Sequence, residues 1–274
     1  MRLFLFLSLF WVTTALTVEA QVSINPTAIT IHQGEPIEEL TVFNSSSEPM
    51  EVSLSMEFGY PDVNAQGAVF VNYSDVEAAG LYGLDAHLRI FPRQFVLEPG
   101  KRQIVRMQAL PMSDRAPGVY WTRVKVASNE VSKDQAELSA SGFSSRVTYR
   151  IQQNIGVFYR NGDVSTGLRL ESVSTAQRAD TLDVTQTVIR TGNSPYLGHL
   201  RMRLLASDGS VAAEHERPFS VYFDRTWTVP VDVSAVPTGV YTLEITTQNR
   251  RADMPDSDIV VGDALQVTRI IRVD

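Results

Sequence analysis

The stretch SRVTYRIQQNIGVFYRNG, residues 145–162, alternates between apolar and polar side chains. The odd positions carry a mostly apolar series, which is Val147, Tyr149, Ile151, Gln153, Ile155, Val157 and Tyr159. The even positions between them are mostly Arg, Thr, Gln and Asn. Because side chains alternate across a β-strand, the pattern predicts one long strand with an apolar and a polar face. Such an apolar face covers either the protein's own core or a partner protein.

Short alternating runs of this kind fill the chain from residue 22 onward, separated by turns rich in Gly, Pro, Asn and Asp. Helical periodicity is nearly absent, so the sequence predicts an all-β protein built from β-sandwiches. The strands form two sets that meet near residue 161. We therefore expect a first domain over residues 21–160 and a second β-sandwich domain over 161–274.

Three segments depart from this pattern. Residues 60–87 are too long for a hairpin connection, and SDVEAAG within them (74–80) predicts a short capped helix. Residues 129–144 are small and polar and predict a mobile loop. The acidic run DMPDSD, residues 253–258, predicts a flexible loop, because it lacks the glycine and the distal Glu of a calcium loop.

Composition narrows the functional classes. The chain of 274 residues carries a net charge of -7, and no basic stripe stands out, so we expect no nucleic-acid partner. The sequence contains no cysteine, which excludes thiol catalysis, disulfides and cysteine-ligated zinc.

The N-terminal segment, residues 1–20, has the layout of a secretory signal peptide. Arg2 precedes an apolar run from Leu3 to Val12, and small residues precede a plausible cleavage after Ala20. The apolar run is too short for a good transmembrane span, although an uncleaved anchor is the alternative. We expect an exported protein with a cleaved signal peptide.

Motifs that carry chemistry are missing from the sequence. The four histidines, which are His32, His87, His199 and His215, do not pair at metal-ligand spacing. There is no nucleophile elbow and no Gly-rich phosphate loop. We therefore expect no catalytic residue, no metal site, no cofactor and no enzymatic activity.

Five blocks follow one another in the first half of the chain. They are VSINPTAITI (22–31), LTVFNSSSEPMEVSLS (40–55), IFPRQFVLEPGKRQIVRM (90–107), VYWTRVKV (119–126) and RIQQNIGVFYR (150–160). The third is the most specific, through Pro92, Phe95, Leu97, Pro99, Gly100, Val105 and Arg106. In these blocks the chain resembles the periplasmic chaperones of the chaperone-usher pathway of pilus assembly, over roughly residues 22–160.

The resemblance implies two immunoglobulin-like domains in tandem and a periplasmic location. It implies that the long strand is donated to a pilin, or to another exported β-subunit, through Val147, Tyr149 and Ile151. An outer-membrane usher is the second partner that it implies. Two alternatives remain open: the three side chains face the protein's own core, and the chain is a structural or adhesive surface protein with no chaperone activity.

The sequence also departs from that family. Ala28 and Gly156 stand where the family places the Arg and the Lys that hold the carboxylate of the subunit, with Gln153 and Asn154 as neutral substitutes nearby. Arg160 matches an arginine of an interdomain ion network, but its acidic partner is replaced in the segment 117–118. The second half does not resemble the second domain of the family.

A carbohydrate-active or other binding enzyme is the remaining rival hypothesis. Its cleft would be lined by aromatic residues such as Tyr73, Tyr82 and Trp121. Trp121 lies in an alternating run, which favours a position in the core.

Overall fold

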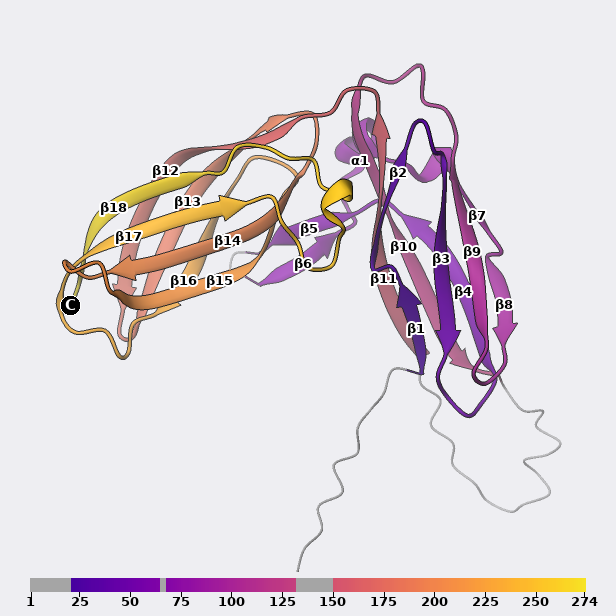
Figure 1. The fold of residues 1–274 in the computed structure, drawn as a ribbon, viewed down its shortest axis with the longest axis horizontal. Coiled ribbons are helices and arrows are strands. Elements are labelled where there is room, and N and C mark those ends of the chain that lie inside the picture. The colour runs from indigo at the N-terminus through magenta and orange to yellow at the C-terminus, as the bar shows by residue number, and fades with distance from the viewer. Residues whose placement is uncertain (1–20, 65–67, 132–149) are drawn as a thin grey trace, which may run out of the picture.

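The computed structural model describes residues 21–64, 68–131 and 150–274, which form five β-sheets: four are arranged as two sandwiches, and the fifth is a two-stranded hairpin (Figure 1). The strands of the first sandwich are β1 (Val22–Asn25), β2 (Ala28–His32), β3 (Ile37–Asn44), β4 (Met50–Glu57), β7 (Leu88–Phe91), β8 (Gln94–Leu97), β9 (Arg102–Ala109), β10 (Gly118–Glu130) and β11 (Arg150–Asn161). Between β4 and β7 lie β5 (Tyr60–Val63), β6 (Val69–Asn72), helix α1 (Val76–Tyr82) and the 3-10 helix η1 (Asp85–His87). The second sandwich has β12 (Thr166–Arg178), β13 (Thr181–Gly192), β14 (Tyr196–Leu205), β15 (Val211–Val221), β16 (Arg225–Asp232), β17 (Gly239–Gln248) and β18 (Gln266–Val273), with the 3-10 helix η2 (Asp256–Asp258) before β18.

The first sandwich packs the sheet β1-β3-β9-β7 against the sheet β2-β11-β10-β4-β8. Its core forms because the strands alternate: in β4, Met50, Val52 and Leu54 are buried while their neighbours are not. Strand β10 differs, since Gly118–Thr122 is buried on both faces. Tyr120 belongs to the core of the sandwich, whereas Trp121 points to the junction with the second sandwich.

The second sandwich packs β12-β13-β16 against β15-β14-β17-β18. The same local hydrogen bond occurs in both sandwiches. The hydroxyl of Tyr120 donates a hydrogen bond to the carbonyl of Ala116 at 2.8 Å, and the hydroxyl of Tyr241 donates one to the carbonyl of Pro237 at 2.7 Å. Both are tyrosine corners of the immunoglobulin type. The architecture is therefore mostly β, with two immunoglobulin-like sandwiches, as the sequence predicts.

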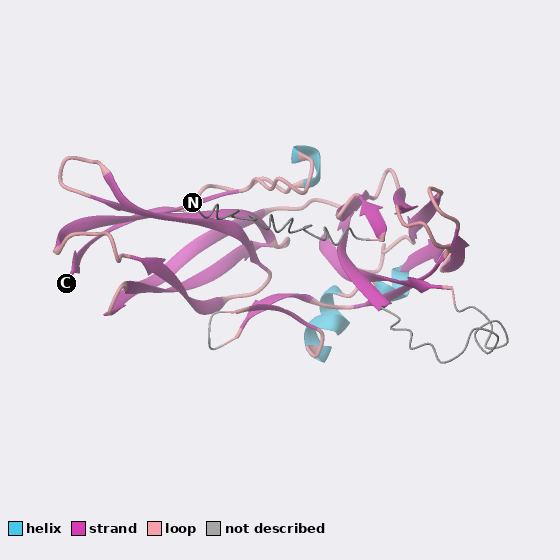
Figure 2. Ribbon diagram, turned by 90° about the horizontal axis from the view of Figure 1, so that it is seen from below, coloured by secondary structure: helices cyan, strands magenta, loops and turns pink. Residues whose placement is uncertain are grey.

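Helix α1 confirms the predicted helix in the segment 74–80. Asp75 is its N-cap, and its carboxylate accepts a hydrogen bond from the backbone N–H of Ala78 at 3.0 Å. The helix and the hairpin β5–β6 lie on one side of the junction between the sandwiches, and η2 lies on the opposite side (Figure 2). Met254 and Ile259, which flank η2, are buried at the junction, whereas residues 255–257 between them are exposed. The predicted loop is thus anchored on both sides of η2, and its flexibility stays a prediction.

Strand β11 confirms the predicted long strand over residues 150–159, and residues 145–149 of that prediction lie outside the described residues. Strand β10 continues to Glu130, two residues into the predicted loop 129–144, and residues 132–144 also lie outside the described residues.

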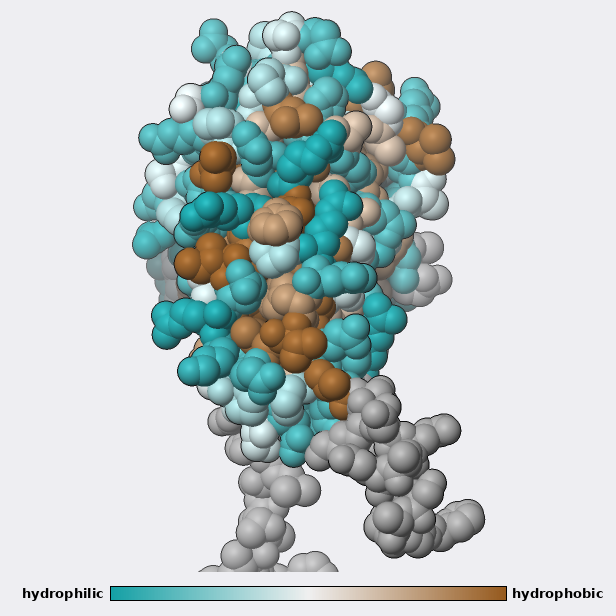
Figure 3. Space-filling view, turned by 90° about the vertical axis from the view of Figure 1, so that its right-hand side faces the viewer, coloured by the Kyte–Doolittle hydropathy of each residue, from teal (hydrophilic) through white to brown (hydrophobic). Residues whose placement is uncertain are grey.

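Exposed apolar side chains on the first sandwich are scattered. Phe91, Val96 and Ile104 belong to β7, β8 and β9, which form the right-hand side of Figure 1. Figure 3 shows that polar side chains separate the apolar groups on this side. Within the described ranges, no helix combines the length and the apolar character that a membrane crossing requires.

Candidate functional site

Strand β11 has a neighbour on both sides along only part of its length. Strand β10 pairs with all of it, from Arg150 to Asn161. Strand β2 runs parallel to it and pairs only with Gly156–Arg160. Since β1 joins the opposite sheet, where it pairs with β3, the edge over residues 150–155 has no strand partner within the described part of the chain (Figure 1).

This open edge arises where the chain changes sheets between β1 and β2. The change occurs at Pro26, which has no N–H to give to a ladder. The only side-chain hydrogen bond across the gap among described residues comes from Gln153, whose Nε2 donates to the carbonyl of Val22 at 2.7 Å. An unpaired edge offers main-chain donors and acceptors to another strand.

The side chains of the open edge keep the alternation that the sequence predicts. Ile151 and Gln153 are half-buried and Ile155 is buried, whereas the residues between them are exposed. Ile151 is therefore partly accessible, and its register partner is Ser128 of β10. The other two residues of the predicted donor face, Val147 and Tyr149, lie outside the described residues.

Ala28 and Gly156 are register partners at the point where β2 meets β11. The two positions that lack the basic residues of the family are therefore neighbours, and both are buried. A positive charge reaches the same point from β10, because Arg123 is the partner of Gly156 on the other side. A Cβ atom on residue 156 would lie 2.9 Å from Nη1 of Arg123, so the guanidinium uses the space that the glycine leaves free.

Arg123 is held in place by groups from two parts of the chain. Its Nε donates to the carbonyl of Gly59 at 3.2 Å, and its Nη2 donates to the hydroxyl of Tyr222 at 3.2 Å. Its Nη1 makes no hydrogen bond within the described residues. Burial raises the pKa of Tyr222, so this hydroxyl stays protonated and accepts from the guanidinium through a lone pair.

The cleft beside Arg123 has a volume of about 250 Å³ and lies between the two sandwiches. It is lined by Thr27, Ala28, Pro61, Arg123, Asn154, Gly156, Phe158, Leu197, Tyr222, Arg251, Asp253 and Met254. Two arginines thus face one aspartate. Hydrogen bonding from Arg251 to Asp253 (Nε–Oδ1 2.7 Å) lowers the pKa of Asp253 and raises that of Arg251, so this pair is ionised and mutually neutralised. Arg123 therefore supplies the uncompensated charge of the cleft.

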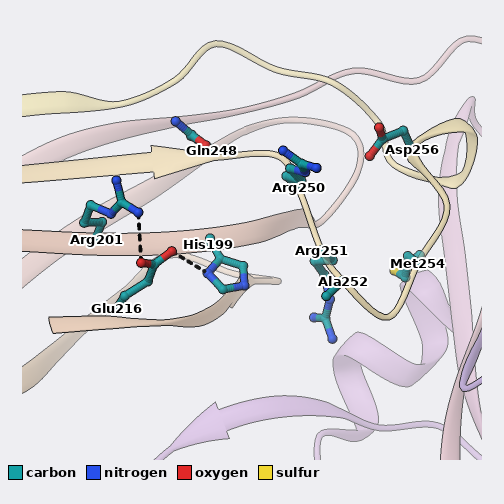
Figure 4. Close-up of a pocket in the computed structure, with 9 residues that line it drawn as sticks. All are labelled: His199, Arg201, Glu216, Gln248, Arg250, Arg251, Ala252, Met254 and Asp256. Atoms are coloured by element: carbon teal, nitrogen blue, oxygen red, sulfur yellow. Dashed lines mark hydrogen bonds and ion pairs between the residues drawn. The ribbon is translucent and has the colours of Figure 1, made fainter.

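A second hollow, of about 650 Å³, lies on the second sandwich and shares Arg251 and Met254 with the cleft. Figure 4 shows that Glu216 bridges two of its basic side chains, Arg201 at 3.0 Å and His199 at 3.4 Å. Arg251 is paired with Asp253, and Arg250 has no ion pair among the described residues. Because most of these basic side chains are paired on an exposed surface, this hollow is a weaker candidate for ligand binding than the cleft.

Arg160, the predicted interdomain residue, lies on β11 and faces the second sandwich. Burial lowers its pKa, and the nearby carboxylate of Asp258 in η2 opposes that effect. The Nη2 of Arg160 is buried without a hydrogen-bond partner among the described residues. An interdomain role for Arg160 stays a prediction.

The aromatic residues of the rival enzyme hypothesis do not line an open cleft. Trp121 is 1% exposed and stacks on Tyr82 with ring centroids 5.0 Å apart. Tyr73 packs over Gly59 and has a buried hydroxyl. In the described part of the chain, no three or more His, Asp or Glu side chains are placed to hold a metal ion.

Three residues of this region were not found by sequence reasoning: Arg123, Arg251 and Asn193. The alternation of β10 predicts a polar side chain at Arg123. It does not predict that this side chain reaches the cleft, which depends on the glycine opposite it on β11. Arg251 and Asn193 lie on loops, where no periodicity predicts a contact.

Comparisons with known proteins find similar solved structures but no sequence relative. No family model matches the chain, and no curated protein matches it. Similar solved structures include the YadV chaperone (10% identity, 90% of this chain and 100% of that chain, TM-score 0.46). They also include the Salmonella enterica SafA pilin in complex with the SafB chaperone (14% identity, 91% and 96%, TM-score 0.44) and the Pseudomonas aeruginosa CupB2 chaperone (12% identity, 92% and 100%, TM-score 0.41). Each of these matches covers about nine tenths of this chain at 10–14% identity, with a TM-score below 0.5.

Proposed function

We propose that this protein is a periplasmic chaperone that caps a pilin, or a similar exported β-subunit, by lending it the open edge of β11. The observation that carries this proposal is the edge over residues 150–155, which has a strand on one side only among the described residues. In strand addition, main-chain hydrogen bonds hold the partner and alternate side chains fill its pockets. Ile151 is the described member of the proposed donor face, which also includes Val147 and Tyr149.

The cleft supports a direction for the added strand. Arg123 lies at the end of the open edge, next to Gly156, and its Nη1 has no hydrogen-bond partner among the described residues. We propose that Arg123 binds the terminal carboxylate of the client, in place of the basic residues missing at positions 28 and 156. A client strand that ends there and passes residues 150–155 runs parallel to β11.

Arg123 changes the energetics that the sequence alone suggests. A hydrogen bond to a charged group contributes about 1.5–3 kcal/mol, so the loss of two basic anchors would cost roughly 3–6 kcal/mol of binding. One arginine in a partly buried cleft restores about half of that loss. The remaining affinity must come from the main-chain ladder and the apolar side chains, each of which contributes about 1.5–3 kcal/mol when fully buried.

The experiment compares two aspartate substitutions on opposite faces of the same strand. Ile151→Asp places a charge on the proposed donor face, whereas Gln152→Asp places it on the exposed face one residue away. Each variant is tagged and expressed in the native host, and the subunits that co-purify with it are quantified by mass spectrometry. Far-UV circular dichroism checks that both variants are folded.

We expect Ile151→Asp, and likewise Tyr149→Asp, to lose the client, and Gln152→Asp to retain it. If all variants retain the client equally, β11 is not the donor strand. The long strand then belongs to a structural or adhesive surface protein in which both sandwiches are spacers.

A further inference from the structure

The junction between the two sandwiches contains a third apolar core. Its buried residues come from the first sandwich, from the segment 60–87 and from the second sandwich, and they are Ala28, Phe58, Tyr60, Ala78, Val119, Trp121, Phe158, Leu197, Tyr222, Met254 and Ile259. The ring of Tyr222 lies 5.0 Å from that of Trp121 and stacks on that of Tyr60 at 5.7 Å. Phe223 adds an edge-on contact with Tyr60 at 4.8 Å. Aromatic packing therefore continues without a break from one sandwich to the other.

The segment 60–87 leaves the first sandwich after β4 and returns to it at β7, yet it contacts the second sandwich. Asp62 on β5 forms an ion pair with Arg225 on β16, with 3.6 Å between Oδ1 and Nη1. Tyr60 donates its hydroxyl to Asp75 at 2.6 Å, and Asp75 caps α1, so the hairpin and the helix are joined. The described parts of the segment, residues 60–64 and 68–87, thus form one unit that spans the junction.

The ion pair between Asp62 and Arg225 is partly buried, with the side chain of Asp62 31% exposed. The side chain of Arg225 is only 17% exposed, and its Nε is buried without a hydrogen-bond partner among the described residues. A buried cation that loses its partner is strongly destabilising, because its desolvation is no longer compensated. Separation of the segment 60–87 from the second sandwich is therefore unfavourable on electrostatic grounds as well as on apolar ones.

The linker on the far side of the junction is fixed by one side chain. The Nδ2 of Asn193 donates to the carbonyls of Pro117 and Asp163, both at 2.9 Å. Its Oδ1 accepts from the N–H of Ser165 at 2.8 Å, and its own carbonyl accepts from Val119 at 3.0 Å. Asn193 thus joins a loop of each sandwich to the linker between them.

We infer that the segment 60–87 and Asn193 form a two-point clamp that locks the sandwiches into one rigid body. The clamp also positions Arg123, because the guanidinium donates hydrogen bonds to the carbonyl of Gly59, which precedes the segment, and to the hydroxyl of Tyr222 in the second sandwich. This second part rests on the proposed function, since it concerns the group that would bind the client.

The clamp is tested without any client, by measuring the distance between the sandwiches. Because the chain has no cysteine, spin labels at Glu98→Cys and Ala235→Cys, two exposed loop positions in different sandwiches, report the separation by pulsed electron paramagnetic resonance. Phe223→Ala weakens one point of the clamp and Asn193→Asp the other. Phe91→Ala is the matched control, because it truncates a phenylalanine that is 77% exposed and away from the junction.

We expect one narrow distance distribution for the wild type and for Phe91→Ala, and a broader one for Phe223→Ala and for the double variant with Asn193→Asp. Calorimetry should show one unfolding transition for the wild type and two for the double variant. A broad distribution in the wild type, or a narrow one in the double variant, overturns the clamp.

The positioning of Arg123 is tested by Tyr222→Phe, which removes only the hydroxyl. We expect about tenfold weaker binding of the client, as for the loss of one hydrogen bond to a charged group, with the distance distribution unchanged. The control is Tyr196→Phe, which removes a buried hydroxyl inside the second sandwich, where Tyr196 is bonded to Thr247 at 3.0 Å. Unchanged client affinity in Tyr222→Phe overturns the positioning role. If the wild type captures no client at all, the proposed function fails, while the distance measurement still decides the clamp.

Discussion

Gly156→Ala tests the close approach between β11 and Arg123. The added Cβ would lie 2.9 Å from Nη1 of Arg123 and 3.0 Å from Cε2 of Phe158, both below an ordinary van der Waals contact. Phe158 is buried in the junction core and cannot move without disturbing it, whereas the guanidinium can move only by breaking its hydrogen bonds to Gly59 and Tyr222.

Two effects of opposite sign decide the magnitude. Overpacking of this kind costs about 1–3 kcal/mol. Replacing a glycine inside a strand returns about 0.5–1 kcal/mol through reduced backbone entropy of the unfolded chain. The clash therefore dominates, and we expect a net loss of about 1–2 kcal/mol, which for a chain of this size lowers Tm by roughly 2–8 °C.

The assay is urea unfolding followed by tryptophan fluorescence, with calorimetry for Tm. Gly80→Ala is the control, because a Cβ on that helical residue meets nothing within 4 Å and should be neutral or stabilising. Adding Arg123→Ala to Gly156→Ala should recover part of the loss, since it removes one of the two clashes. A Gly156→Ala protein as stable as the wild type would refute the assignment of the guanidinium to the space above residue 156.

Three further predictions concern other parts of the fold. Asn44→Ala should cost about 2–4 kcal/mol in urea unfolding, because it removes the hydrogen bonds of this fully buried side chain: Nδ2 donates to the carbonyls of Glu48 and Leu97, both at 2.8 Å, and Oδ1 accepts from the N–H of Ser46 at 2.9 Å. Asp253→Asn should make the free energy of unfolding less dependent on pH in the acid range. The hydrogen bond from Arg251 lowers the pKa of Asp253, so this pair stabilises the native state fully above the pKa of an unfolded Asp, near 3.9. The stabilisation is lost as the pH falls through the lower native pKa of Asp253. Tyr120→Phe should cost about 0.5–1.5 kcal/mol through loss of its tyrosine corner, and unchanged thermal stability would contradict that role.

The sequence predicts the sandwiches well because alternation reports burial directly. Met50, Val52 and Leu54 are buried at every second position of β4, as period two requires. The helix cap at Asp75 was also readable, since a capping side chain acts within three residues. Both signals are local, and local signals do not require knowledge of which segments meet in space.

The junction could not be predicted for the opposite reason. Met254 lies within an acidic run that has the composition of a solvated loop, and it is buried only because a second sandwich approaches it. Trp121 is buried, as the sequence predicts, but it is buried by the segment that follows β4 and by the second sandwich, and not by the core of its own sandwich. Contacts of this kind depend on how two sandwiches are placed relative to each other. The alternation of side chains within a strand does not report that placement.

The missing basic residues illustrate the same limit, because the charge of the cleft comes from a neighbouring strand. When β11 alone is compared with the family, Gly156 stands where a basic residue is expected, so the cleft has one charge fewer. Judged across the sheet, it is the absence of a side chain there that gives Arg123 of the neighbouring strand room to lie over β11. Adjacent strands are only about 4.8 Å apart, so either of them can place a charged side chain at the same location. Electrostatic anchors in β-sandwiches should therefore be sought on cross-strand partners of a substituted position before the anchor is considered lost.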